Sequence, residues 1–183
     1  MFTSRLTIIR VWIKSTIVLL TLVGATASCS TTASRSNDLA TKYNVKQEVL
    51  AAHNKWRKQH QAPNLVWDDQ LANYAARYAS RCEFKHSSSP YGENLATGYP
   101  SATIAVNFWY GEHAQYFYGR PGFSMRTGHF TQMIWKSTQK LGCAYVACNG
   151  RNGTPGKFLV CEYSPAGNVM GDRYFQENVL PSV

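Results

Sequence analysis

Apolar side chains recur every three or four residues in three segments of the chain, a spacing typical of helices that bury one face. Asp68 and Ser101 precede two of these segments, where their side-chain oxygens can cap the first free N–H groups of a helix. A shorter stretch, His129–Trp135, predicts a helical turn or a short helix. The three longer predicted helices run from Val45 to about His60, from Asp68 to about Ala79, and from Ser101 to about Tyr116.

The last third of the chain carries two short apolar runs that predict strands. These runs are Leu141–Asn149 and Phe158–Tyr163, and the turn residues 149–153 between them predict a hairpin. Serines, glycines and prolines predict a loop over Ser87–Pro100 and a second loop over Gly119–Gly128. Because helices precede strands within one domain-sized chain, the predicted fold class is α+β.

The first 27 residues have the pattern of a secretory signal peptide. Three basic residues precede or flank the apolar run Thr16–Gly24, which is too short to span a bilayer as a helix. Ala25-Thr26-Ala27 fits the small-x-small rule and predicts cleavage after Ala27. The alternative is an uncleaved anchor over Thr7–Gly24, which two of the basic residues interrupt.

The expected mature chain has a flexible Ser/Thr-rich lead over residues 28–42 and one domain over residues 43–180. We expect this protein to be secreted, extracellular and monomeric. Removal of residues 1–27 takes away three basic residues and no acidic one, so the formal net charge falls from +9 to +6. The charges form no run of about five or six, which favours a solvated basic surface over a nucleic-acid site. Attraction to an anionic membrane surface or cell-wall polymer stays open.

The chain has five cysteines, and an exported protein lies where disulfides form and persist. Cys29 belongs to the lead, where residues 26–29 only partly resemble a lipoprotein attachment site, so four cysteines remain for pairing. Cys143 and Cys148 lie at an odd separation on one predicted strand, which turns their side chains to opposite faces and disfavours a bond between them. Cys161, in the next strand, can reach one of the two. Zinc is a weaker alternative because the chain has no C-x-x-C pair.

Five segments in order resemble the CAP superfamily of cysteine-rich secretory, antigen 5 and pathogenesis-related proteins, and most closely its single-domain fungal members. The resemblance covers about Val45 to Tyr174 and implies a three-layer α-β-α sandwich with a central, mainly antiparallel sheet. It also implies the disulfides Cys82–Cys148 and Cys143–Cys161, the pairing that we favour. The five segments are His86-Ser87, Gly92–Leu95, Trp109–Glu112, Gly128–Trp135 and Phe158–Val169.

Four residues of these segments match the family's cleft of two histidines and two glutamates, namely His86, Glu93, Glu112 and His129. The resemblance implies that they meet, and such a set could hold a divalent ion such as zinc or magnesium, though not an obligatory one. Glu93 and Glu112 are the candidate catalytic residues, since a carboxylate can exchange protons and a bound ion can activate water. Taken singly, each of the four also has a structural explanation, as a turn cap, a loop anchor, an exposed helix position or a helix start.

The loop after the third predicted helix is rich in aromatic residues. Tyr116, Tyr118 and Phe123 fit the spacing aromatic-x-aromatic-x4-aromatic, and the resemblance to fungal members implies that this loop binds a sterol. Apolar rings on a loop offer a flat surface to an apolar ligand or a membrane. The alternative is that Tyr116 and Phe123 fold back onto the core.

In the last of the five segments, Glu162 departs from the family pattern, since many relatives have Asn or Gln after the cysteine that corresponds to Cys161.

Three functions follow from these residues and the resemblance. The first is a secreted module that binds a sterol or related lipid, in lipid export or in contact with a host. The second is a metal-assisted, protease-like hydrolase that uses the four cleft residues. The third is an antimicrobial or host-interaction protein that acts through its surface. No nucleophile motif of the G-x-S-x-G or H-E-x-x-H type supports an enzyme.

Overall fold

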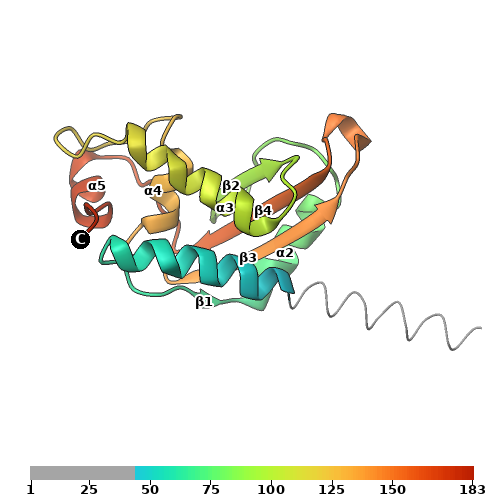
Figure 1. Ribbon diagram of the computed structural model, residues 1–183, viewed down its shortest axis with the longest axis horizontal. Helices are drawn as coiled ribbons and strands as arrows, with labels where there is room; N and C mark the ends of the chain where they lie inside the picture. The colour runs from blue at the N-terminus through green and yellow to red at the C-terminus, as the bar shows by residue number, and fades with distance from the viewer. Residues whose placement is uncertain (1–43) are drawn as a thin grey trace, which may run out of the picture.

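The structure, a computed structural model, describes residues 44–183 (Figure 1). The expected signal peptide, the lead and Cys29 therefore lie outside the described residues. No helix within residues 44–183 has both the length and the apolar character needed to cross a membrane. The elements are the first helix (residues 44–59), β1 (Val66–Trp67), α2 (Asp69–Ala79), β2 (Gly92–Thr97), α3 (Ala102–Gly111), η1 (Glu112–Gln115), α4 (Gly128–Ile134), β3 (Lys140–Ala147), η2 (Arg151–Gly153), β4 (Lys157–Ser164) and α5 (Asp172–Asn178).

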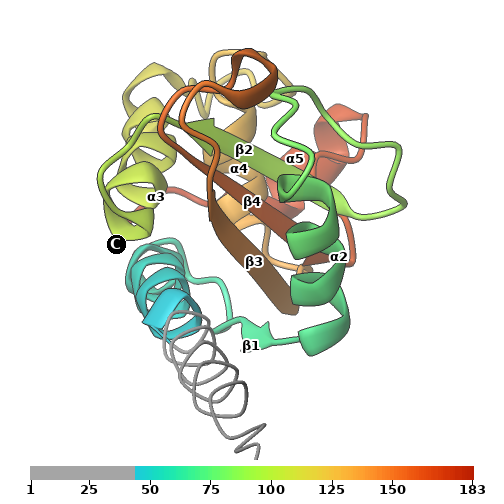
Figure 2. The ribbon, with the colours of Figure 1, turned by 90° about the vertical axis from the view of Figure 1, so that its right-hand side faces the viewer.

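The four strands form one sheet in the order β1-β3-β4-β2. β4 is antiparallel to both of its neighbours, and only the two-residue β1 runs parallel to β3. Figure 2 shows α2 on one side of the sheet and the first helix and α3 on the other. The α+β class and the three-layer arrangement with a mainly antiparallel sheet are therefore confirmed.

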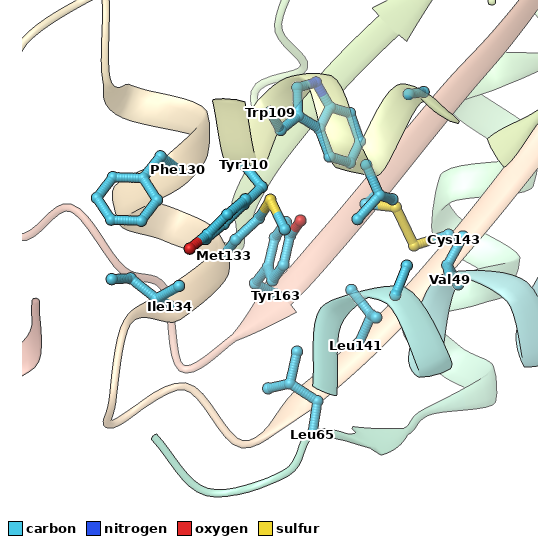
Figure 3. Close-up of a cluster of buried hydrophobic side chains, with 14 of the residues drawn as sticks. Val49, Leu65, Trp109, Tyr110, Phe130, Met133, Ile134, Leu141, Cys143 and Tyr163 are labelled. Carbon is cyan, nitrogen blue, oxygen red and sulfur yellow. A yellow bond between two sulfur atoms is a disulfide. The ribbon is translucent and has the colours of Figure 1, made fainter. Parts of the chain in front are cut away.

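Alternate side chains of β3 and β4 fill two separate apolar cores, one on each face of the sheet. In the larger core, Leu141 and Tyr163 of the sheet meet Trp109 of α3 and Phe130 of α4, as Figure 3 shows. The smaller core lies under α2, which contacts both central strands. A Cβ at Gly142 would lie 2.2 Å from a backbone nitrogen of α2, so this close packing requires glycine there.

The two disulfides lie on opposite faces of the sheet. Cys143 is in the larger core and bonds Cys161, its register partner on β4. Cys148 is in the smaller core and bonds Cys82, which follows α2. The predicted separation of Cys143 from Cys148 is confirmed, and so is the pairing.

Helix starts are predicted more accurately than the loops between them. Asp68 accepts hydrogen bonds from the backbone of residues 70 and 71, and Ser101 accepts one from Ile104, so both act as the predicted caps. The third predicted helix is wrong at its end, because α3 stops at Gly111 and the chain continues as the 3-10 turn η1. The apolar pattern gave no signal for α5.

The predicted loop Ser87–Pro100 is wrong in its middle, where the chain forms β2. This strand pairs with β4 along its whole length, from Gly92 opposite Tyr163 to Thr97 opposite Phe158. Glycine, glutamate and asparagine are uncommon in strands, so pairing with β4 overrides the local preference. The correction matters for the site because β2, and not a loop, carries Glu93.

Candidate functional site

His86 and Glu93 form a hydrogen-bonded pair beside the first residues of β2. Nδ1 of His86 lies 2.7 Å from Oε1 of Glu93, which also accepts the backbone N–H of Ser87 at 2.9 Å. The Glu93 side chain is only 6% exposed, whereas that of His86 is 62% exposed. Burial alone would raise the pKa of Glu93, but hydrogen bonds from His86 and Ser87 outweigh it and lower that pKa. The hydrogen bond with Glu93 raises the pKa of His86 in turn.

Glu162 lies opposite Glu93 across the β2–β4 ladder and is fully buried. Its Oε2 accepts a hydrogen bond from Ser89 Oγ at 3.2 Å. Oε1 of Glu162 and Oε2 of Glu93 are buried and accept no hydrogen bond from the described residues. Burial, and then the charge of Glu93 and a hydrogen bond with it, raise the pKa of Glu162 to about 8. A protonated Glu162 can therefore donate to the Glu93 carboxylate. In the sequence, Glu162 stood out only as a departure from the family pattern, with no indication that it would contact Glu93.

Glu112 and His129 form a second pair between the end of α3 and the start of α4. Oε1 of Glu112 lies 2.6 Å from Nδ1 of His129, and Oε2 accepts the backbone N–H groups of His129 and Phe130 at 3.0 and 3.1 Å. The carboxylate thus satisfies free N–H groups at a helix start. Because an ionised carboxylate only accepts, Nδ1 carries the hydrogen. Nε2 of His129 then remains, with no hydrogen-bond partner in residues 44–183.

Asn94 connects the cleft to the core. Its side-chain nitrogen donates to the backbone oxygen of His129 at 3.0 Å and to the Tyr163 hydroxyl at 3.2 Å. The same hydroxyl lies 2.8 Å from Nε2 of His53 in the first helix. Asn94 therefore fixes the backbone that carries His129. Its place inside one of the matching sequence segments was the only signal for this role.

Three of the four predicted cleft residues line one small pocket, which we call the His–Glu pocket. His86, Glu93 and His129 line this cavity of about 170 Å³, and Glu112 binds His129 from outside the lining. The structure thus brings together two histidine–carboxylate pairs rather than four converging ligands. The other lining residues are Asn94, Phe123, Met125, Gly128 and Asn168, of which the sequence had indicated only Phe123, as part of the aromatic loop.

Within residues 44–183, no group of three or more histidine, cysteine, aspartate or glutamate side chains is arranged to hold a metal ion. Each carboxylate instead binds Nδ1 of a histidine, which is how carboxylates orient histidines behind a metal site. Nε2 of His86 and Nε2 of His129 are therefore the atoms that fit an ion. Water or ligand oxygens would have to complete its coordination.

The aromatic loop, residues 116–123, presents some of its rings and buries another. Tyr116 is buried and packs edge-on against Phe130. Tyr118 and Phe123 are 37% and 43% exposed, and Phe117, which the spacing motif does not include, is 72% exposed. Tyr116 therefore anchors the loop to the core, while the other three rings are available for contact with a ligand.

A larger apolar groove lies between α3 and the outer edge of β2, and we call it the α3–β2 groove. Its volume is about 860 Å³, within the range of roughly 300–1,000 Å³ found for small-molecule sites. The sequence gave no signal for it, because its walls come from four separate segments. The lining residues are Phe84, Leu95, Ala96, Thr97, Tyr99, Ile104, Asn107, Phe108, Trp109, Gly111, Glu112, Gln115 and His129.

The remaining histidines are parts of the core or its rim. His53 is buried with both ring nitrogens bonded, and burial lowers its pKa to about 4. His60 is also buried, and burial lowers its pKa. His113 stacks on Tyr110.

Comparison with known proteins finds relatives of this chain in fungi and plants, and some of the fungal ones are named as secreted proteins. The cysteine-rich secretory protein family, CAP, matches residues 50–163. Secreted protein RBT4 of Candida albicans is 42% identical over 174 residues, which cover 85% of the chain and 47% of that protein. Protein PRY2 of Saccharomyces cerevisiae is 43% identical over 138 residues, 73% of the chain and 40% of that protein. Pathogenesis-related protein 1 of Arabidopsis thaliana is 42% identical over 133 residues, 69% of the chain and 80% of that protein.

The chain spans about half the length of the fungal relatives that it matches.

Solved structures share its fold. The crystal structure of NaASP2 with Zn²⁺ superposes with a TM-score of 0.60 at 27% identity, over 76% of the chain and 86% of that structure. Schistosoma mansoni venom allergen-like protein 4 superposes with a TM-score of 0.58 at 24% identity, over 67% of the chain and 88% of that structure.

Proposed function

Because the chain belongs to the CAP family of cysteine-rich secretory proteins, we propose that it is a secreted protein that binds a sterol or a related small lipid. Several fungal relatives are named as secreted proteins, which supports an extracellular place of action. Binding of a lipid there would serve lipid export or the sequestration of lipid at a host surface. Contact with a membrane or cell wall would bring the protein to its ligand.

The observation that carries this proposal is the exposure of apolar rings on the aromatic loop beside the His–Glu pocket. Phe123 lines that pocket, and Phe117 and Tyr118 project from the same loop. The buried ring of Tyr116 packs against α4, and this contact anchors the loop that carries the exposed rings. Rigid aromatic rings bind apolar ligands with little loss of conformational entropy.

Saturation binding of labelled cholesterol or ergosterol tests the proposal. Burial of one large side chain against a ligand contributes roughly 1.5–3 kcal/mol. The double variant Phe123→Ala, Tyr118→Ala should therefore bind at least about tenfold more weakly, since about 1.4 kcal/mol is a factor of ten. Val66→Ala is the control, because Val66 is an exposed apolar residue on the opposite edge of the sheet. Absence of sterol binding by the wild type rules the proposal out.

A metal-assisted hydrolase is the second candidate, and the two histidine–carboxylate pairs favour it. His86 and His129 would hold the ion through Nε2, while Glu93 and Glu112 fix their rings through Nδ1. A bound ion would supply Lewis-acid chemistry and an activated water. A structural relative has been solved with Zn²⁺.

Calorimetric titration with Zn²⁺ separates this candidate from a binding protein without metal. His86→Ala with His129→Ala should abolish binding while the far-ultraviolet circular dichroism stays native. His113→Ala is the matched control, since its ring lies against Tyr110. Unchanged affinity in the double variant would place the ion elsewhere. Turnover of a peptide or ester that is lost in Glu93→Ala would favour the hydrolase.

A further inference from the structure

The α3–β2 groove has an apolar body and one polar end. Ile104 and Phe108, one helical turn apart on α3, are 40% and 61% exposed, and Phe84 on the facing segment is 55% exposed. Large apolar side chains this exposed and gathered around one concavity are typical of a binding site. Glu112, Gln115 and His129 gather where α3 passes into η1.

His129 lies between the groove and the His–Glu pocket, since its side chain lines both. The His–Glu pocket, at about 170 Å³, is smaller than the roughly 300–1,000 Å³ typical of small-molecule sites, whereas the groove, at about 860 Å³, falls within that range. A lipid whose polar group contacts His129 must therefore place its apolar body in the groove. The aromatic loop contributes Phe123 to the smaller pocket and none of the residues that line the groove.

The charge at the polar end selects the head group. The Glu112 carboxylate lines the groove and holds Nδ1 of His129, which leaves Nε2 as the polar atom of the ring that a ligand can reach. A hydroxyl group can both donate to Nε2 or to the carboxylate and accept from Gln115. An anionic head would instead meet the negative charge of Glu112 at close range.

We propose that the α3–β2 groove binds the body of an uncharged lipid with a hydroxyl head, such as a sterol or a long-chain alcohol, and that the hydroxyl binds at Glu112 and His129. This inference rests on the proposed function. It adds the place where the ligand binds and a preference for hydroxyl lipids over fatty acids. The groove, rather than the aromatic loop, then encloses the ligand.

Gly111 offers a way to fill the groove without removing any contact. It lines the groove, and a Cβ at this position would meet no atom within 4 Å. Its φ angle lies outside the left-handed region, and alanine is preferred over glycine in helices. Gly111→Phe should therefore fold and project a ring into the groove, and Gly111→Ala is the matched control.

Saturation binding of labelled ergosterol to the full chain, with thermal unfolding of each variant, is the test. We expect Gly111→Phe to bind at least tenfold more weakly than the wild type and Gly111→Ala to lose less. Val66→Phe, which adds a ring on β1 and outside the groove, should bind like the wild type. If Gly111→Phe does not fold, Phe108→Ala with Ile104→Ala, whose side chains are largely exposed, replaces it with the same expected loss. Octadecanol should compete for ergosterol at a concentration at least tenfold below that of stearate at neutral pH.

The outcomes separate this inference from the proposed function. One outcome is that the wild type binds ergosterol and the groove variants bind it equally well, while the loop variant Phe123→Ala, Tyr118→Ala does not bind it. In that case the groove is not the binding site, and the proposed function stands. If the wild type binds no sterol, the proposed function and this inference both fail. If stearate competes as well as octadecanol or better, the assignment of the head group is wrong.

Discussion

Buried polar groups of the first helix and those of the cleft are satisfied in different ways. Arg57 is fully buried and has no acidic partner within residues 44–183, yet its guanidinium donates to four carbonyl oxygens, those of residues 63, 133, 135 and 138. His53 likewise has both ring nitrogens bonded. At the wall of the His–Glu pocket, Oε2 of Glu93 and Nε2 of His129 have no hydrogen-bond partner among the described residues, and Oε1 of the buried Glu162 opposite Glu93 likewise has none.

This difference separates structural from functional polar groups. A charge whose hydrogen bonds are all made inside the fold holds elements together and has nothing left for a ligand. Polar atoms left open at the wall of a pocket reduce stability and are retained where they serve binding or catalysis. Changes in the first region should therefore alter stability, and changes in the second should alter pH dependence and ligand binding.

The largest expected effect is on stability, from Arg57→Met. This change removes the guanidinium from four carbonyl groups, and only that of Trp135 keeps another donor within the described residues, the backbone N–H of Thr138. Three of the four lost bonds are buried, and breaking such a buried network costs about 3–5 kcal/mol. Urea unfolding followed by circular dichroism measures it. Lys58→Met, the exposed neighbour, should change stability by less than about 0.5 kcal/mol. A loss below about 1 kcal/mol in Arg57→Met would show that the guanidinium does not join these elements.

Glu162→Gln tests the opposite region. The folded pKa of Glu162 is raised from 4.5 to about 8, so the folded chain binds the extra proton between these values. Its contribution to stability is therefore full below about pH 4.5 and is lost as the pH rises through about 8. Glutamine cannot ionise, so the variant should gain on the order of 2 kcal/mol over the wild type at pH 9 and little at pH 4.5.

Unfolding at several pH values measures this gain, with the exposed Glu177→Gln as control. A difference between Glu162→Gln and the wild type that does not vary with pH would mean that folding does not raise the pKa of Glu162.

The smallest effect should come from Glu112→Gln. The glutamine oxygen can still accept from the start of α4, but the negative charge near those N–H groups is lost, which costs about 0.5–1 kcal/mol. The amide nitrogen also cannot accept a hydrogen bond from Nδ1 of His129. Thermal unfolding together with the chemical shifts of His129 measures both changes. An unaltered His129 ring would mean that Glu112 does not orient it.

The sequence predicted those features that depend on local spacing. The helix caps Asp68 and Ser101 and the opposite faces of Cys143 and Cys148 follow from one helical turn or one strand period. It failed where distant pairing decides the structure, as in β2, whose polar residues become a strand only beside β4. For the same reason, the sequence could name the four cleft residues only through a family resemblance.

The buried contact of Glu162 with Glu93 and the α3–β2 groove were not predictable from the sequence. The contact depends on the register between two strands, and no local pattern fixes that register. The groove depends on Phe84, β2, α3 and His129 converging from four segments. The helical spacing predicts only that one face is buried, whereas the structure leaves the Phe108 ring on α3 open to the groove.

In the proposed complex, an uncharged lipid lies in the α3–β2 groove with its hydroxyl group at His129, and the buried polar groups of the first helix take no part in binding. Nuclear magnetic resonance of the histidine side chains during titration with ergosterol tests it most directly, because it reports each ring in the same sample. We predict that the ring signals of His129 shift saturably, while those of His53, whose nitrogens are both bonded in the core, stay in place. Saturable sterol binding that leaves the His129 signals unmoved would contradict the account.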